Sequence, residues 1–230
     1  MLTNEVKTDM QEFISREKAR GDCYRFLSAC FYQPKKDIFI QEGLFGNLSA
    51  SLKLVSPEAS AVASELEKEF PGYTEEELAV DYARLFVGPN ELIAPPYGSI
   101  YLDKERRVMG DSTIEVINMY EQAGLSMNKD FPELPDHIAA ELEFMHYLIF
   151  KEIEAIEKSD IESATGFMKM QDVFIDRFLG RWIVPFCKRI QEGTGNLFYK
   201  NLADCVSIFV MTQNAGYDIP KALNIKAGIN

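Results

Sequence analysis

The stretch PDHIAAELEFMHYLIFKEIEAIEKS, residues 135–159, decides the fold class of this chain. Its large apolar residues recur every three or four positions, which places them on one face of an α-helix. Pro135 suits the first turn of such a helix, because its missing N–H is not needed there. The stretch therefore predicts one long helix from Pro135 to about Ser159, with a buried face made of Ile138, Leu142, Met145, Ile149, Ile153 and Ile156.

The same helical periodicity continues on both sides of this stretch, and no run of alternating residues predicts a β-strand. We therefore expect one all-α domain over residues 1–230, a globular bundle of about nine helices. The segment 88–110 is rich in proline and glycine and is predicted to be a long structured loop, a feature that is often functional. The tail from Asn214 is expected to be irregular. The predicted helices cover approximately residues 10–32, 37–54, 57–70, 74–87, 111–124, 135–159, 161–179, 180–193 and 198–209.

The chain carries a net charge of -12, from 36 acidic and 24 basic residues. A surface of this sign repels nucleic acid and anionic membranes and attracts basic partners. The excess acid can also serve only to keep the protein soluble, and charge alone does not separate these two interpretations. No apolar run is long enough to span a membrane. We therefore expect neither nucleic acid binding nor a membrane span.

The four cysteines form no CxxC pair and lie in apolar helical stretches. They are expected to be buried free thiols, a use of cysteine that fits a reducing compartment. The N-terminal sequence MLTNEVKTDMQEF lacks the apolar core of a secretory signal. We therefore expect a cytoplasmic protein with free thiols at Cys23, Cys30, Cys187 and Cys205.

Catalytic motifs are missing from the sequence. It has neither a G-x-S-x-G motif nor a glycine-rich phosphate loop, and its only histidines are His137 and His146. Glu143 and His146 have the i, i+3 spacing of di-iron helical bundles, but such a site needs a second Glu-x-x-His from another helix. The sequence offers none, so a metal-dependent bundle enzyme is the weakest alternative. The sequence predicts no catalytic residue, metal site or cofactor. Glu143 and His146 are expected to form a simple pair on a helix flank.

Asp136 and His137 stand at the start of the long predicted helix and have two interpretations. Asp136 stabilises the positive end of a helix dipole, so the pair can be an ordinary helix start with an exposed histidine. Alternatively, both side chains face a groove, where the Asp136 carboxylate binds an arginine through two hydrogen bonds. Spacing alone favours the first interpretation. The nine acidic and two basic residues from Glu133 to Glu162 favour a basic ligand, although part of this charge is the solvated face of one helix.

Several segments, in order along the chain, resemble the TorD/DmsD family of redox-enzyme maturation chaperones. Each segment alone is a weak signal, but their shared order is specific. The ELPDHI segment is similar to an E-x-P-D-H signature of the family. The segments are DYARLFVGP (81–89), APPYGSIYLD (94–103), MGDST (109–113), ELPDHI (133–138), WIVPF (182–186) and FYKNLA (198–203).

The resemblance implies an all-helical protein that binds the twin-arginine signal peptide and the apo form of a molybdenum-cofactor oxidoreductase in the cytoplasm. Such a chaperone holds its client until the cofactor is loaded and then releases it for export. The resemblance further suggests components of the twin-arginine translocase as partners, and a domain-swapped homodimer as an alternative to a monomer. A closely related alternative is a NarJ-like assembly factor, which serves a molybdoenzyme that is not exported.

The resemblance also assigns peptide-binding residues. Asp136, His137 and Gly110 match family positions tied to peptide binding. The central loop carries tryptophans in the DmsD branch, whereas the only tryptophan here is Trp182, which leaves the identity of the client open. The apolar middle of the peptide is expected to contact a surface that includes Tyr82, Leu85, Phe86, Pro96, Tyr97, Ile100 and Tyr101.

Overall fold

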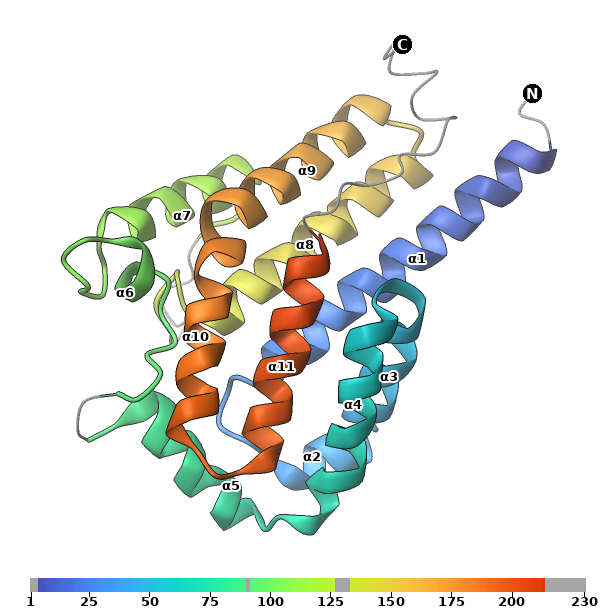
Figure 1. The fold of residues 1–230 in the computed structure, drawn as a ribbon. Coiled ribbons are helices and arrows are strands. Elements are labelled where there is room, and N and C mark those ends of the chain that lie inside the picture. The colour runs from blue at the N-terminus through green and yellow to red at the C-terminus, as the bar shows by residue number, and fades with distance from the viewer. Residues whose placement is uncertain (1–3, 90–91, 127–132, 214–230) are drawn as a thin grey trace.

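The computed structural model describes residues 4–89, 92–126 and 133–213, and no β-strand occurs within these ranges. Figure 1 shows the helices packed together as one bundle. The prediction of an all-α fold is confirmed. The elements are α1 (Asn4–Ala29), α2 (Lys36–Gln41), α3 (Leu44–Val55), α4 (Pro57–Glu69), η1 (Phe70–Gly72), α5 (Glu75–Tyr82), η2 (Ala83–Val87), α6 (Ser99–Leu102), α7 (Asp111–Gln122), α8 (Ile138–Glu157), α9 (Ile161–Phe174), η3 (Ile175–Leu179), α10 (Gly180–Gly193) and α11 (Leu197–Thr212).

The larger helices pack into a closed circuit. Helix α8 packs against α1 and against α9, and α1 also packs against α3. Helix α3 packs against α4, and α4 packs against α11. Helix α11 packs against α10, which continues from α9 and closes the circuit. Each of these helices therefore contacts two others, and the core fills the space that they enclose.

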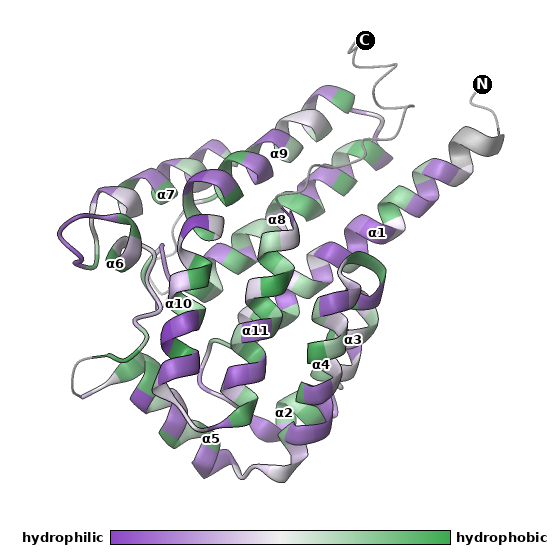
Figure 2. Ribbon diagram, viewed as in Figure 1, coloured by the Kyte–Doolittle hydropathy of each residue, from purple (hydrophilic) through white to green (hydrophobic). Residues whose placement is uncertain are grey.

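The apolar face that the sequence predicts for α8 lies in this core. All six residues of that face, from Ile138 to Ile156, are at most 7% exposed. Figure 2 shows hydrophobic and hydrophilic residues alternating along most helices, as expected when one side of each helix faces the core. Aromatic rings fill the interior beside it, and three of them form mutual contacts with centroids 5.7 to 6.1 Å apart, namely Phe31, Phe86 and Phe186.

The nine predicted spans become eleven α-helices in the described ranges for two local reasons. The span 37–54 is divided into α2 and α3, because Gly43 between them is left-handed with φ of 57°. The predicted loop at 88–110 contains one helical turn, α6. Helix α1 ends at Ala29 and not near residue 32. The predicted irregular tail from Asn214 lies outside the described residues.

A π-helical segment joins α9 to α10. This segment, η3, replaces the boundary that the sequence predicted near residue 180, so that the helical backbone continues from α9 into α10 and changes direction between them (Figure 1). Gly180 permits this geometry, because a Cβ there would lie only 2.6 Å from the carbonyl oxygen of Ile175. Pro185 lies inside α10.

A buried polar group links α1, α8 and α9. The Arg20 guanidinium donates to Glu17 Oε2 at 2.8 Å and lies 3.7 Å from Glu152 Oε2. Gln171 donates to the same oxygen of Glu152 at 2.7 Å. Burial, together with the charge of Glu17, raises the pKa of Glu152 to about 7. Because removal of one partner would leave a buried charge uncompensated, the group ties the three helices together.

The four cysteines are free thiols buried in the core, as the sequence predicts. Burial raises the pKa of each thiol, so all four stay protonated at neutral pH. Among the described helices, none combines the length and hydropathy that crossing a membrane requires.

Two helical glycines give a matched pair of stability predictions. Gly180→Ala places a methyl group against the Ile175 carbonyl oxygen and should lower the free energy of unfolding by about 1–3 kcal/mol. Gly166→Ala in α9, where no atom lies within 4 Å of the new Cβ, should raise it by about 0.5–1 kcal/mol. Urea unfolding followed by circular dichroism measures both changes. Equal effects would contradict the role assigned to Gly180.

Candidate functional site

A short antiparallel bridge joins the proline-rich loop to the start of α8. Tyr97 and His137 pair as an isolated β-bridge. The bridge is closed by two backbone hydrogen bonds of 2.8 Å, from Gly98 N–H to Asp136 O and from Ile138 N–H to Pro96 O. Two of the segments that carried the family resemblance are therefore in direct contact. We call residues 95–99 together with 135–138 the loop–helix junction.

The side chain of Asp136 points into the protein and not toward solvent. It is 1% exposed, and its Oδ2 accepts a hydrogen bond from the Ser99 N–H at 2.8 Å. Asp136 thereby holds the start of α6 against α8. The predicted helix start at Pro135 is wrong by three residues, because α8 begins at Ile138 after an N-cap at His137, so Asp136 precedes the helix. Direct contact of Asp136 with a ligand stays a prediction.

His137 caps α8 with its imidazole ring. Its Nδ1 accepts a hydrogen bond from the Ala139 N–H at 3.2 Å, which places the ring proton on Nε2. The residue is 2% exposed, and burial lowers its pKa to about 4, so it is neutral at pH 7. Nε2 faces Glu133, whose Oε2 lies 3.9 Å away. The exposed histidine of the first interpretation is therefore a buried one.

A buried glutamate and the only tryptophan support the junction from the core side. Trp182 Nε1–H donates to Glu141 Oε2 at 2.9 Å, and neither side chain is exposed. Burial raises the pKa of Glu141 well above its usual value. Gly98 packs on both, because a Cβ there would lie 3.0 Å from Glu141 Oε1 and 3.1 Å from Trp182 Nε1. The backbone of the loop therefore lies directly on two buried polar side chains.

The aromatic residues of the loop are partly covered. Tyr101 stacks on Trp182 with ring centroids 5.5 Å apart, and its hydroxyl donates to Pro95 O at 3.0 Å. Tyr97 and Tyr101 keep part of their surface exposed, as does Ile100, whereas Pro96 is buried. Of the loop residues expected to contact a peptide, the two tyrosines and Ile100 therefore offer surface in this conformation, and Pro96 does not.

Three residues that were expected to contact the apolar part of a peptide lie in the core. Leu85 is 0% exposed, Phe86 4% and Tyr82 8%. The Tyr82 hydroxyl donates to Phe31 O at 3.2 Å. In this conformation the three side chains support the bundle beneath the loop. Their contact with a peptide stays a prediction and would require the loop to move.

Gly110 lies beside a carboxylate that caps α7. Asp103 accepts hydrogen bonds from the Ser112 N–H at 3.3 Å and from the Ser112 hydroxyl at 3.1 Å. A Cβ on Gly110 would overlap the Asp103 carboxylate. The structure thus gives Gly110 a role in closing the loop onto α7, while its contact with a peptide stays a prediction.

A group of residues around His137, from the end of α1 and the segment after it, has no signal in the sequence pattern. The Tyr32 ring stacks on the His137 ring with centroids 6.3 Å apart. Glu143 Oε1 accepts hydrogen bonds from the Tyr32 hydroxyl at 2.9 Å and from the Ser28 hydroxyl at 3.1 Å. Tyr32 is 111 residues from Glu143 along the chain, so no local pattern could reveal this contact.

Glu143 and His146 do not form the surface pair that their spacing predicts. Glu143 binds Tyr32 and Ser28, as described above, and His146 Nδ1 lies 2.9 Å from Gly21 O on α1. Both side chains therefore connect α8 to the first helix and not to each other. Across the ranges that the structure describes, no group of three His, Cys, Asp or Glu side chains is placed to hold a metal ion.

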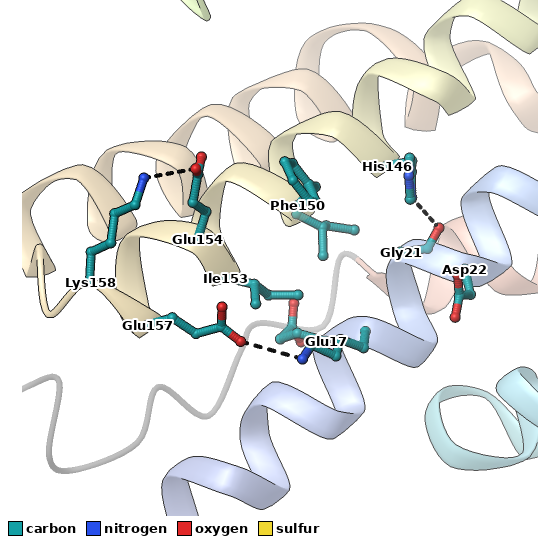
Figure 3. Close-up of a pocket in the computed structure, with 11 residues that line it drawn as sticks. Glu17, Gly21, Asp22, His146, Phe150, Ile153, Glu154, Glu157 and Lys158 are labelled. Atoms are coloured by element: carbon teal, nitrogen blue, oxygen red, sulfur yellow. Dashed lines mark hydrogen bonds and ion pairs between the residues drawn. The ribbon is translucent and has the colours of Figure 1, made fainter.

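A groove of about 700 Å³ follows the seam between α1 and α8 (Figure 3). Gly21 allows the helices to approach, because a Cβ there would lie 3.3 Å from Ile149. Ile149 and Ile153 are buried at the groove, and Phe150 is 56% exposed beside them. The volume suits a ligand or a short run of side chains. At the rim, one ion pair joins α1 to α8, Lys18 with Glu157 at 3.4 Å, and a second lies along the end of α8, Lys158 with Glu154 at 2.8 Å.

The buried imidazole predicts a specific dependence of stability on pH. The pKa of His137 is about 4 in the folded protein and 6.5 for an unperturbed histidine, so the unfolded chain binds more protons between these values. The free energy of unfolding should therefore fall as the pH falls from 6.5 to 4, by up to about 3 kcal/mol. His137→Asn keeps an oxygen for the Ala139 N–H but does not titrate. Urea unfolding at several pH values should show this loss in the wild type only, and parallel curves would contradict it.

The chain is similar to proteins named chaperone protein TorD. The relative from Photobacterium profundum is 35% identical over 54% of this chain and 56% of its own length. The relative from Shewanella loihica is 26% identical over 84% of this chain and 90% of its own length. The relative from Aliivibrio salmonicida is 28% identical, with 83% and 90% covered.

The fold is similar to a crystal structure from Archaeoglobus fulgidus, described as that of a candidate redox enzyme maturation protein. The TM-score is 0.51 at 23% identity, and the match covers 83% of this chain and 93% of the other. The family model described as nitrate reductase delta subunit matches residues 53–188. This range includes the complete loop–helix junction and Trp182. The chain therefore belongs to the nitrate reductase delta subunit family.

Proposed function

We propose that this protein is a cytoplasmic, non-catalytic chaperone for a molybdenum-cofactor oxidoreductase. It binds the twin-arginine leader peptide of the apo-enzyme, holds the precursor until the cofactor is loaded, and then releases it to the translocase. Membership of the nitrate reductase delta subunit family, together with relatives that are named as chaperones, is the observation that carries this proposal.

The surface chemistry around the loop–helix junction supports a peptide of this kind. A twin-arginine leader has a basic start and an apolar middle. The protein is strongly acidic, and Glu133 and Glu143 lie at the surface on either side of the buried His137. The α1–α8 groove offers apolar surface farther along α8. Acidic and apolar surfaces in this order match the basic and apolar parts of a leader.

A client that is not exported is the second candidate. The family description names a subunit of nitrate reductase, which favours an assembly factor for a non-exported molybdoenzyme. Such a factor would bind a segment of its client that has no pair of adjacent arginines. The two candidates therefore differ in whether binding depends on those arginines.

Leader binding is tested by calorimetric titration with a synthetic peptide that has two adjacent arginines followed by about 12 apolar residues. The dissociation constant should lie between nanomolar and micromolar values and should rise with salt, because opposite charges attract. A scrambled peptide of the same composition is the control. Equal binding of both peptides, or none at low salt, would reject the leader-binding function.

A pair of variants separates direct contact from positioning at Asp136. Asp136→Asn keeps an oxygen for the Ser99 N–H, whereas Asp136→Ala removes the hydrogen bond that holds the loop. Because the carboxylate is buried, the Asn variant should bind the leader within about twofold of the wild type, and the Ala variant roughly tenfold more weakly. The opposite outcome, in which Asn fails as badly as Ala, would show a direct ion pair between Asp136 and the peptide.

A further inference from the structure

We propose that two tyrosine–glutamate pairs, Tyr32 with Glu143 and Tyr97 with Glu133, each bind one arginine side chain of the leader. The apolar residues that follow the arginines then enter the α1–α8 groove. This assignment rests on the leader-binding function proposed above, and it places recognition of the arginines on residues other than Asp136 and His137.

Both carboxylates lack a cationic partner. In the described part of the chain, neither Glu133 nor Glu143 has a lysine or arginine within ion-pair distance, and the histidine near Glu133, His137, is neutral. Burial raises the pKa of Glu133, which shows that its charge is poorly solvated. Other carboxylates nearby on α8 are paired, as Glu154 and Glu157 are with Lys158 and Lys18. A cation would therefore bind more favourably to Glu133 and Glu143 than to the carboxylates that already have a lysine partner.

Each carboxylate is held by a tyrosine. The Tyr32 hydroxyl donates to Glu143 Oε1 at 2.9 Å, and the Tyr97 hydroxyl donates to Glu133 Oε2 at 3.5 Å. Burial, with the charge of the neighbouring glutamate, raises the pKa of both tyrosines, so they remain donors at neutral pH. A carboxylate beside an aromatic ring suits a guanidinium, which binds the first through hydrogen bonds and the second by stacking.

The buried His137 holds the two pairs in place. The Tyr32 ring stacks on the imidazole at 6.3 Å, and the Tyr97 ring meets it edge to face at 5.4 Å. The imidazole Nε2–H points to Glu133 Oε2 at 3.9 Å, and in the described ranges it has no acceptor within hydrogen-bond distance. The two pairs therefore lie on either side of one imidazole ring, and their carboxylates are the acceptors that a cationic group would use.

The α1–α8 groove continues from this surface along α8. Glu143 and Phe150 are both exposed and are seven residues apart, so they share a face of the helix at a separation of about 10 Å. An extended peptide crosses this distance in about three residues. The apolar run of a leader would therefore reach Phe150, Ile149 and Ile153 soon after its arginines.

The arginine sites are tested by calorimetric titration of two synthetic leaders, one with two adjacent arginines and one with glutamines in their place. For the arginine leader, Glu143→Gln and Glu133→Gln should each raise the dissociation constant roughly fivefold, and the double variant roughly 20-fold. For the glutamine leader, all variants should bind like the wild type. Glu58→Gln, which removes an exposed charge on α4, is the matched control and should change neither.

The results of this titration show whether the proposed arginine sites are wrong or the leader-binding function itself is wrong. If the wild type binds the arginine leader and the glutamate variants bind it equally well, the two pairs are not the arginine sites and the function stands. The same conclusion follows if the variants lose affinity for both leaders alike. If the wild type does not bind the arginine leader, the function itself fails, and the site with it.

The groove is tested with a second matched pair. Phe150→Ser should raise the dissociation constant of the arginine leader roughly fivefold, because it removes half-exposed apolar surface from the groove. Ile114→Ser on α7 removes a side chain of similar exposure elsewhere, 57% against 56%, and should have no effect. A leader with serines in place of its apolar run should not distinguish Phe150→Ser from the wild type. Equal binding by both variants would place the apolar run outside the groove.

Discussion

The bridge between the proline-rich loop and the start of α8 is the contact on which the rest of the site depends. It consists of two backbone hydrogen bonds around Tyr97 and His137, and the Asp136 carboxylate adds a third bond to the same loop. Glu141 and Trp182 form its buried floor, and Gly98 is the one residue whose lack of a side chain lets the loop reach them. Because these bonds lie inside the protein, Asp136 and His137 have a structural role in the first place. Its surface consequence is to present the tyrosines on either side of the imidazole.

Charge is distributed differently inside the bundle and at this surface. In the core, Arg20 compensates Glu17 and Glu152, and Gln171 completes the group. At the surface above His137, two glutamates are held in position by tyrosines without a cation among the described residues. A protein that had only to be stable would gain little from such an arrangement at Glu133, since a partly buried carboxylate without a cationic partner loses solvation. The arrangement is consistent with a basic ligand that supplies the missing charge.

Periodicity was sufficient to predict the all-α fold and the buried face of α8, because one-sided burial repeats with the helical period. The same logic could not place Asp136, whose partner is a backbone N–H 37 residues away. It also could not find Tyr32, since a stacked ring and one hydrogen bond leave no repeating pattern. The loop–helix junction was foreseen only as two family-like segments, and their pairing came from the structure. Gly43 and Gly180 altered helix boundaries through backbone geometry that apolar spacing does not encode.

The contact between α1 and α8 affects when the protein can fold during its synthesis. Ser28 and Glu143 meet across 115 residues of chain, and His146 meets Gly21 across 125. Contacts of such long sequence separation are slow to form, because closing a long loop costs entropy before the contact repays it. The first helix must therefore wait for most of the chain to be synthesised before its partner exists. The groove on this seam is therefore absent from every shorter nascent chain, and any function that uses it begins only after the protein's own folding is nearly complete.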